Sequence, residues 1–146
     1  MSAHMVCGVH HRVTVSSGSP FEDRVGYSRA VRVGPFVAVA GTTAPGPTAS
    51  AQTREALRRI AAALAEVGAS LSDVVRTRIF VTDIASWPEV GAVHAEVFGA
   101  IRPAATMVEV SALIDPGLVV EIEADAYVTG GDEGGSGANT PSGPGA

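Results

Sequence analysis

Residues 118–128 alternate between apolar and mostly acidic side chains, and this alternation constrains the fold more than any other feature of the chain. Because successive side chains of a β-strand point to opposite sides of a sheet, the segment predicts a strand with one apolar side. The apolar side comprises Leu118, Val120, Ile122, Ala124, Ala126 and Val128, and the other side comprises Val119, Glu121, Glu123, Asp125 and Tyr127. The apolar side is expected to face helices. The other face is either open to water or closed by a partner subunit, in which case its charges must pair.

The rest of the chain supplies five further strands and two helices. The strands are expected at 12–15, 29–33, 36–41, 74–82 and about 105–112, with turns at Gly34-Pro35 and Asp115-Pro116-Gly117. The helices are expected at 52–67, where Leu57, Ile60, Leu64 and Val67 share one face, and at 86–98, where Ser86, Pro88 and Glu89 indicate a capping box. The order βββαβαββ predicts an α+β fold, a six-stranded mixed sheet with both helices on one face.

Charged residues are expected to meet on the sheet face opposite the helices. Counting by the same alternation places Ala105, Met107 and Glu109 on that face together with Glu121. On strand 74–82, two arginines are the expected partners of these carboxylates; they are Arg76 and Arg78.

Composition limits the possible functions. The 146 residues fit one domain, expected at 12–129, between a flexible N-terminus (1–11) and a disordered Gly/Ser/Pro-rich tail (130–146). A net charge of −5 argues against binding nucleic acid through its phosphates. The chain has one cysteine, no signal-peptide pattern and no long apolar span, so we expect a cytoplasmic protein without a disulfide or membrane contact. The histidines near the N-terminus indicate a frayed start or extension, and no metal site is expected.

Several short segments occur in an order that is typical of one known family. Residues 102–110 read RPAATMVEV, 119–124 read VVEIEA, 27–34 read YSRAVRVG and 36–43 read FVAVAGTT. Together with matches at 52–57, 68–75 and 80–83, they cover nearly all of residues 26–128. In this arrangement the chain resembles the YjgF/RidA family of L-PSP endoribonuclease-like proteins, the reactive-intermediate deaminases.

The resemblance implies a chorismate-mutase-like fold (bacillus type) and a homotrimer with small-molecule clefts between adjacent subunits. In the family, an arginine fixes the carboxylate of an enamine or imine substrate, while a glutamate and backbone groups position the attacking water. No metal or organic cofactor is implied. The glutamate corresponds to Glu121, and the other cleft positions correspond to Tyr27, Ser28, Gly41, Thr42, Ala105 and Met107.

The chain departs from the family pattern at the arginine, whose position is occupied by Ala105. The change removes a charge-assisted contact worth about 1.5–3 kcal/mol, or roughly ten- to a hundredfold in affinity. Gly91 and His94 also stand where many members have an asparagine and a tyrosine. We therefore expect a branch of the family that lacks the carboxylate-binding arginine.

Individual residues keep two interpretations at this point. Glu121 is either a catalytic acid or base that holds a water, or a partner of Arg76 or Arg78 in a salt bridge. Arg78 either supplies the missing cation for an anionic ligand or neutralises Glu109 or Glu121. His94 is expected to be a surface or packed residue, not a catalytic one.

Two functional hypotheses follow. The first is a homotrimer that hydrolyses the C–N bond of an enamine or imine without a metal, with Glu121 positioning water. The alternative is a non-catalytic trimer that binds a small ligand such as a carboxylate or an imine. Endoribonuclease activity is disfavoured by the acidic balance of the chain.

Overall fold

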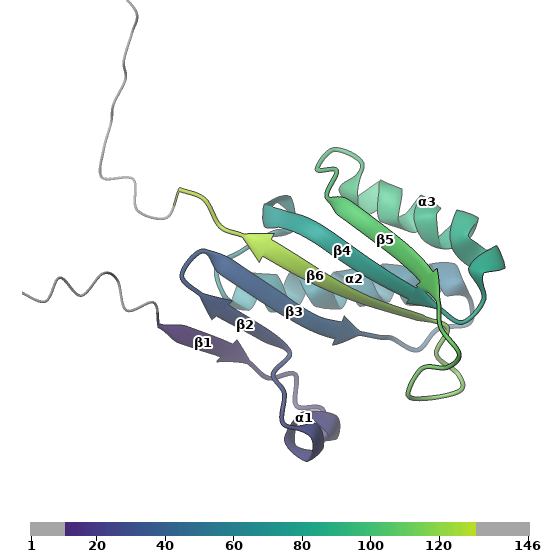
Figure 1. Ribbon diagram of the computed structural model, residues 1–146, viewed down its shortest axis with the longest axis horizontal. Coiled ribbons are helices and arrows are strands. Elements are labelled where there is room, and N and C mark those ends of the chain that lie inside the picture. Colours follow the sequence, from purple (N-terminus) through teal and green to yellow (C-terminus); the bar gives the residue numbers. More distant parts are fainter. Residues whose placement is uncertain (1–10, 131–146) are drawn as a thin grey trace, which may run out of the picture.

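The computed structural model describes residues 11–130, which form one six-stranded sheet with two long helices against it (Figure 1). The strands are β1 (Arg12–Val15), β2 (Ala30–Val33), β3 (Phe36–Thr42), β4 (Val74–Val81), β5 (Ala104–Glu109) and β6 (Val120–Tyr127). Their order in the sheet is β1-β2-β3-β6-β4-β5. The β4–β5 pair is parallel and the other pairs are antiparallel. The predicted α+β class and mixed six-stranded sheet are confirmed.

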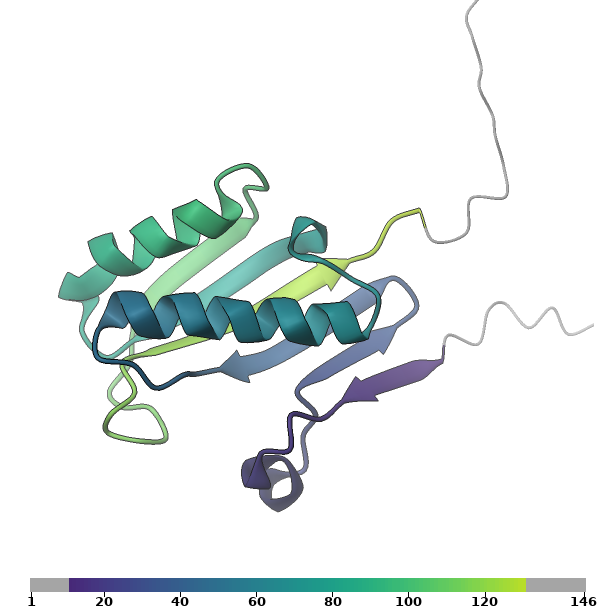
Figure 2. The ribbon, with the colours of Figure 1, turned by 180° about the vertical axis from the view of Figure 1, so that it is seen from behind.

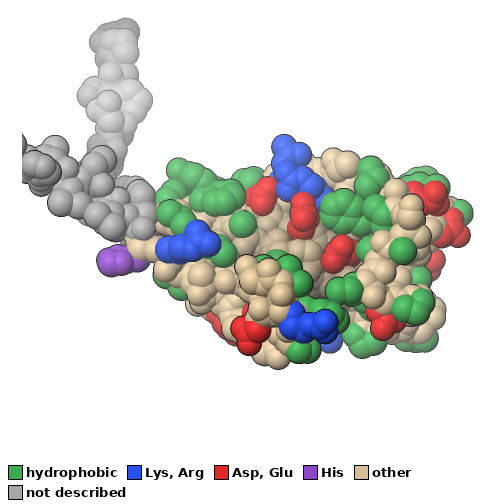
Figure 3. Space-filling view, turned by 60° about the horizontal axis from the view of Figure 1, so that its bottom comes forward, with side chains coloured by type: hydrophobic (Ala, Val, Ile, Leu, Met, Phe, Trp, Pro, Cys, Tyr) green, Lys and Arg blue, Asp and Glu red, His purple; other side chains and the backbone are tan. Residues whose placement is uncertain are grey.

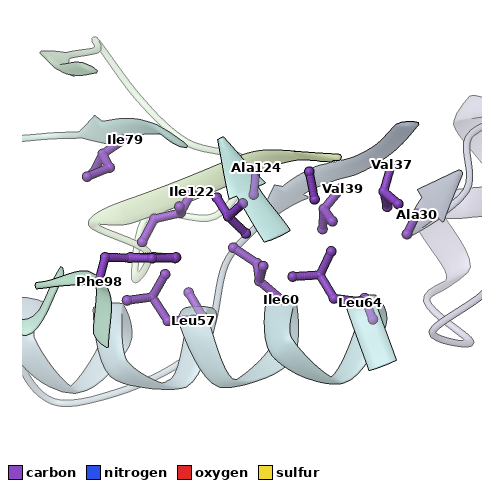
Figure 4. Close-up of a cluster of buried hydrophobic side chains, with 14 of the residues drawn as sticks. Ala30, Val37, Val39, Leu57, Ile60, Leu64, Ile79, Phe98, Ile122 and Ala124 are labelled. Atoms are coloured by element: carbon purple, nitrogen blue, oxygen red, sulfur yellow. The ribbon is translucent and has the colours of Figure 1, made fainter. Parts of the chain in front are cut away.

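Helices α2 (Ala49–Glu66) and α3 (Trp87–Phe98) lie on the same face of the sheet (Figure 2). The apolar stripe predicted on the first helix packs against the sheet, with Leu57, Ile60 and Leu64 at most 1% exposed (Figure 4). Ile122 and Ala124 of β6 meet them from the sheet, as the alternation predicts. Full burial of a side chain of this size stabilises the fold by about 1.5–3 kcal/mol. The alternation of β6 is therefore what fixes the side on which the helices pack.

A short helix, α1 (Pro20–Val25), lies between β1 and β2 and was not predicted. The Ser19 hydroxyl accepts a hydrogen bond from the Phe21 N–H at 3.3 Å, which caps the helix. Gly26 ends it with a φ of 87°, a left-handed conformation that favours glycine. Six residues are too few to show a periodic apolar stripe, so the pattern gives no signal of this helix.

The beginning of α3 differs in detail from the prediction. Pro88 lies in the first turn as expected, but the Ser86 side chain makes no capping hydrogen bond to the helix. Its hydroxyl donates instead to the Asp83 carbonyl oxygen at 2.7 Å, because residues 84–86 form a short 3-10 turn. The predicted capping box is therefore wrong.

The face assigned to β5 is also wrong. Ala105 lies beside Thr77 and Met107 beside Ile79 in the parallel register with β4, and both β4 residues point toward the helices. Met107 accordingly packs against the core. A loop separates β5 from β6, so the alternation of β6 does not carry over to β5. Ala105, Met107 and Glu109 therefore lie on the face opposite to that of Glu121.

The expectations for the N-terminus and the tail fall on residues 1–10 and 131–146, which lie outside the described residues. Within residues 11–130, no helix is both long and apolar enough to cross a membrane. The strand expected at 105–112 ends at Glu109, and a loop follows it.

Candidate functional site

A cleft of about 1280 Å³ opens at the end of β3, between α1, α2 and the loop before β6. Its wall includes Tyr27, Gly41, Thr42 and Glu121, four of the residues expected at a ligand site. Apolar side chains from α1 and from the loop line other parts of it. Figure 3 shows a view with the α1 end turned forward, where acidic, basic and apolar side chains are intermixed. The cleft thus offers both charged and apolar contacts.

The Glu121 side chain packs on the backbone of Gly41. A Cβ atom on residue 41 would lie 2.8 Å from Glu121 Oε1, which is closer than such atoms approach in proteins. Beside it, β3 carries an irregularity between Val39 and Thr42 where it pairs with β6. Irregularities of this kind locally re-aim side chains and often lie next to active sites. The carboxylate has its position in the cleft because residue 41 has no side chain.

The pKa of Glu121 is shifted by its surroundings. Burial raises the pKa above its ordinary value of 4.5, and the nearby Glu123 carboxylate raises it further. The Arg29 guanidinium acts in the opposite direction by stabilising the charged form. A half-buried carboxyl group with a raised pKa is suited to exchanging protons with a bound molecule.

Arg29 is a cleft residue that the sequence reasoning missed. Its Nη1 donates to the Gly41 carbonyl at 2.7 Å and to Thr42 Oγ1 at 3.1 Å, and its Nη2 donates to the Tyr27 hydroxyl at 3.3 Å. Its guanidinium carbon lies 5.6 Å from the centre of the Tyr27 ring, within range of a cation–π contact. A usable signal was the YSR sequence itself, which puts a cation two residues after the tyrosine expected at the site.

Arg78 lies away from this cleft, on the open face of the sheet. Its Nη1 contacts Glu123 at 3.1 Å and Asp125 at 3.3 Å. The predicted pairing between arginines of β4 and carboxylates of β6 is confirmed for Arg78, but its partners are not Glu109 or Glu121. Ser28 lines a second, smaller cleft beside these two acidic residues. In the described part of the chain, Glu121 forms no salt bridge with Arg76 or Arg78.

Ala105 and Met107 are not brought to the Glu121 cleft within one chain. They belong to β5, an edge strand that is separated from β6 by β4. Ala105 is exposed and Met107 is half-buried. Any contribution from them to a site around Glu121 requires a second copy of the chain.

His94 is a packed residue, as expected. Its Nε2 lies 2.9 Å from the hydroxyl oxygen of buried Thr77, and its ring centre lies 4.7 Å from that of Phe98. Burial lowers the pKa of His94, which favours the neutral ring. Among residues 11–130, no group of three or more His, Cys, Asp or Glu side chains is placed to hold a metal ion.

Comparison with known proteins gives the family. The model of the family described as Endoribonuclease L-PSP matches residues 19–128. The chain belongs to this family. A solved structure of Rv2704 from Mycobacterium tuberculosis, described as a member of the YjgF/YER057c/UK114 family, is 69% identical. It superposes with a TM-score of 0.80, and the match covers 81% of this chain and 100% of that one.

Relatives of known sequence also match the chain. An uncharacterized protein of Streptomyces coelicolor is 38% identical over 77% of this chain and 90% of its own length. A RutC family protein of Pyrococcus abyssi is 37% identical over 69% of this chain and 85% of its own length. The 3-aminoacrylate deaminase RutC of Acinetobacter baylyi is 41% identical over 55% of this chain and 63% of its own length.

Proposed function

We propose that this L-PSP family member is a homotrimeric deaminase that hydrolyses an enamine or imine without a metal, with Glu121 as its catalytic residue. The observation that carries the proposal is the Glu121 carboxyl group, which lies against Gly41 in the cleft and has a raised pKa. The named activity of the related RutC, which deaminates 3-aminoacrylate, supports the reaction class. The assignment to a branch without the carboxylate-binding arginine is part of this proposal and rests on Ala105.

The proposed reaction needs one general base and one water. The ionised Glu121 carboxylate accepts a proton from water as the water oxygen forms a bond to the imine carbon. The resulting carbinolamine takes the proton from Glu121 onto its nitrogen. Glu121 then takes the hydroxyl proton of the carbinolamine and passes it to the nitrogen as the C–N bond breaks, so that ammonia leaves and the carbonyl product remains. Atoms balance as imine plus water giving carbonyl compound plus ammonia, and Glu121 returns to its initial state.

The proposed trimer is supported by the open face of the sheet. Large apolar residues are exposed on it, with Phe36 46%, Val108 41% and Tyr127 50% exposed, among the half-buried charges of β6. Exposed apolar area of this kind is typical of a surface that a partner covers. A neighbouring chain could also bring Ala105 and Met107 of its β5 edge toward the Glu121 cleft. Sedimentation equilibrium should give three times the 14.8 kDa chain mass, and a monomer at micromolar concentration would contradict the trimer.

Turnover of imines generated from a broad amino-acid panel tests the deaminase proposal. Glu121→Ala should lower the rate at least roughly tenfold, since it removes the proposed base. Glu89→Ala is the matched control, because Glu89 is exposed on α3 and does not line the cleft. If no imine is hydrolysed faster than in buffer, the deaminase proposal fails.

The second candidate is a non-catalytic trimer that binds a small ligand in the same cleft. Ala105 favours it, because a functional group that the family pattern places there is missing. Thermal-shift measurements with keto acids, amino acids and aromatic acids, combined with the turnover assay, separate the two candidates. Stabilisation by one of these ligands, together with no turnover of any imine, would support a protein that binds the ligand without converting it.

A further inference from the structure

The Glu121 cleft contains an arginine, Arg29, that acts on the Glu121 carboxylate through its charge but forms no salt bridge with it. Three arginines line it, and two of them, Arg58 and Arg59, contact Glu55 at 2.6 Å and 3.3 Å. Arg29 forms no salt bridge with any residue in the described part of the chain. A half-buried cation in a cleft is a favourable partner for an anion that enters from solvent.

The geometry of Arg29 leaves donors free for such an anion. A guanidinium group has five N–H donors, and the hydrogen bonds to Gly41, Thr42 and Tyr27 use three of them. These same bonds hold the group in one orientation, so little conformational entropy is lost when a ligand binds. Thr42 is itself fixed, since its hydroxyl donates to the Ala40 carbonyl at 2.8 Å. Arg29 is therefore a preorganised cation.

Gly41 connects this cation to the proposed base. Its carbonyl accepts the Arg29 bond, and its missing Cβ leaves the space that the Glu121 carboxyl group occupies. A ligand anchored on Arg29 is thus presented next to Glu121.

The cleft wall around these residues has an apolar part that matches a hydrocarbon body. Phe21 and Val25 of α1 are 38% and 71% exposed, and Ile114 of the loop before β6 is 66% exposed; all three line the cleft. Covering such side chains with a ligand contributes about 25 cal/mol for each Å² removed from water. The chemistry of the cleft therefore fits a carboxylate with an apolar body better than a small hydrophilic acid.

We propose that Arg29 binds the carboxylate of the ligand, in place of the arginine missing at Ala105, and that the apolar body of the ligand lies against α1. The proposal names the ligand class of the deaminase site and so rests on the proposed use of this cleft. It makes Arg29 the residue that determines specificity for an acid over a neutral molecule.

The test compares two unreactive probes by isothermal titration calorimetry on the full chain: 3-phenylpropionate and its neutral amide, 3-phenylpropionamide. The wild-type protein should bind the acid roughly ten- to a hundredfold more tightly than the amide, because only the acid forms charge-assisted bonds. Arg29→Gln should abolish this preference and leave amide binding in place. Arg24→Gln, which removes an exposed cation of α1 that does not line the cleft, should keep it.

Equal binding of acid and amide by the wild-type protein would overturn the proposal, as would an unchanged acid preference in folded Arg29→Gln. Circular dichroism establishes whether that variant folds. Should it not fold, the Arg29 Nε–H resonance of the wild-type protein decides: the acid and not the amide should shift it, and no shift overturns the proposal.

The same experiments separate this proposal from the deaminase proposal. An acid preference that depends on Arg29, without turnover of any imine, supports carboxylate binding by Arg29 and rejects the deaminase proposal. Imine turnover with an unchanged KM in folded Arg29→Gln rejects carboxylate binding by Arg29 and is consistent with the deaminase proposal.

Discussion

The carboxyl group of Glu121 occupies the space that a side chain at residue 41 would fill. A Cβ at Gly41 would come within 2.8 Å of Glu121 Oε1 and 3.0 Å of its Cδ. Gly41 has no positive φ, so its backbone conformation is open to other residues. The need for glycine at this position therefore comes from the glutamate and not from the backbone, which ties the identity of residue 41 to the proposed function.

Gly41→Ala should impair catalysis while preserving the fold. The atoms that must move are at the end of a flexible side chain, so the cost in stability should be about 1 kcal/mol, the lower end of the range for overpacking. The displaced carboxyl group should lower imine hydrolysis at least roughly tenfold, because general base catalysis depends on a hydrogen-bond distance. Parallel turnover assays and urea denaturation measure the two effects.

Gly91→Ala is the matched control for this substitution. Its Cβ would meet nothing closer than Trp87 Cε3 at 3.9 Å, on helix α3. It should leave activity unchanged and stabilise the protein by roughly 0.5–1 kcal/mol through helix propensity. Full activity in Gly41→Ala would contradict the proposed role of Glu121.

Glu121→Gln should make the fold more stable at neutral pH. The pKa of Glu121 is raised in the folded protein, mainly by burial, so the folded state binds a proton more readily than the unfolded state. The wild-type protein therefore loses stability as the pH rises from the ordinary carboxyl pKa of 4.5 through the raised value. A glutamine at this position stays neutral, so the variant does not lose this stability. The gain should be a few degrees in Tm at about pH 7.5 and should vanish near about pH 4.

Glu96→Gln is the control for the pH dependence. Glu96 is an exposed glutamate, whose pair with Arg54 lies at the surface with side chains 62% and 58% exposed. Such pairs contribute little, so its Tm should change by less than that of Glu121→Gln at neutral pH. A destabilised Glu121→Gln at neutral pH would show that the carboxylate is a stabilising group and would remove the physical basis for a raised pKa.

Arg78→Ala should affect stability more than ligand binding. Its guanidinium contacts two half-buried carboxylates, Glu123 and Asp125, which are left beside each other when it is removed. We expect a loss of about 0.5–1 kcal/mol, the upper part of the range for partly exposed ion pairs. Affinity for 3-phenylpropionate should change less than roughly threefold, because the charge that binds the acid is assigned to Arg29. A tenfold loss of affinity for 3-phenylpropionate in a folded variant would show that Arg78 takes part in ligand binding.

The sequence predicted those parts of the fold that repeat along the chain. The alternation of β6 and the apolar stripe of α2 are local patterns, and both have the predicted orientation because burial selects one side of each element. The face of Ala105 and Met107 was not predictable in the same way, since the parallel register with β4 determines it. Alternation gives two faces for a strand, and only its pairing decides which of them is covered.

In the cleft, too, some residues were predictable from the sequence and others were not. Tyr27, Gly41, Thr42 and Glu121 were expected at one site, and the fold brings them to one wall. Arg29 was missed because its role depends on contacts with the Gly41 carbonyl and the Thr42 hydroxyl, 12 and 13 residues away. Such contacts follow from the pairing of β2 with β3 and from the irregularity in β3, and neither has a signature in the composition of the segment.

Gln52 should prove to be the residue that holds two loops of the cleft in place. Its side chain is 2% exposed; Nε2 donates to the carbonyls of Gly46 at 3.1 Å and Gly117 at 3.0 Å, and Oε1 accepts from the Val119 N–H at 2.9 Å. Gln52→Leu leaves all three backbone groups without this partner, so we expect a loss of about 2–4 kcal/mol in urea denaturation. Ligand affinity should also fall, because both glycines line the cleft.

Thr53→Val is the comparison for Gln52→Leu. The Thr53 hydroxyl makes one local hydrogen bond, to the Ala49 carbonyl at 2.7 Å, so its removal should cost about 1 kcal/mol. Equal losses in the two variants would show that the loops are held by other contacts.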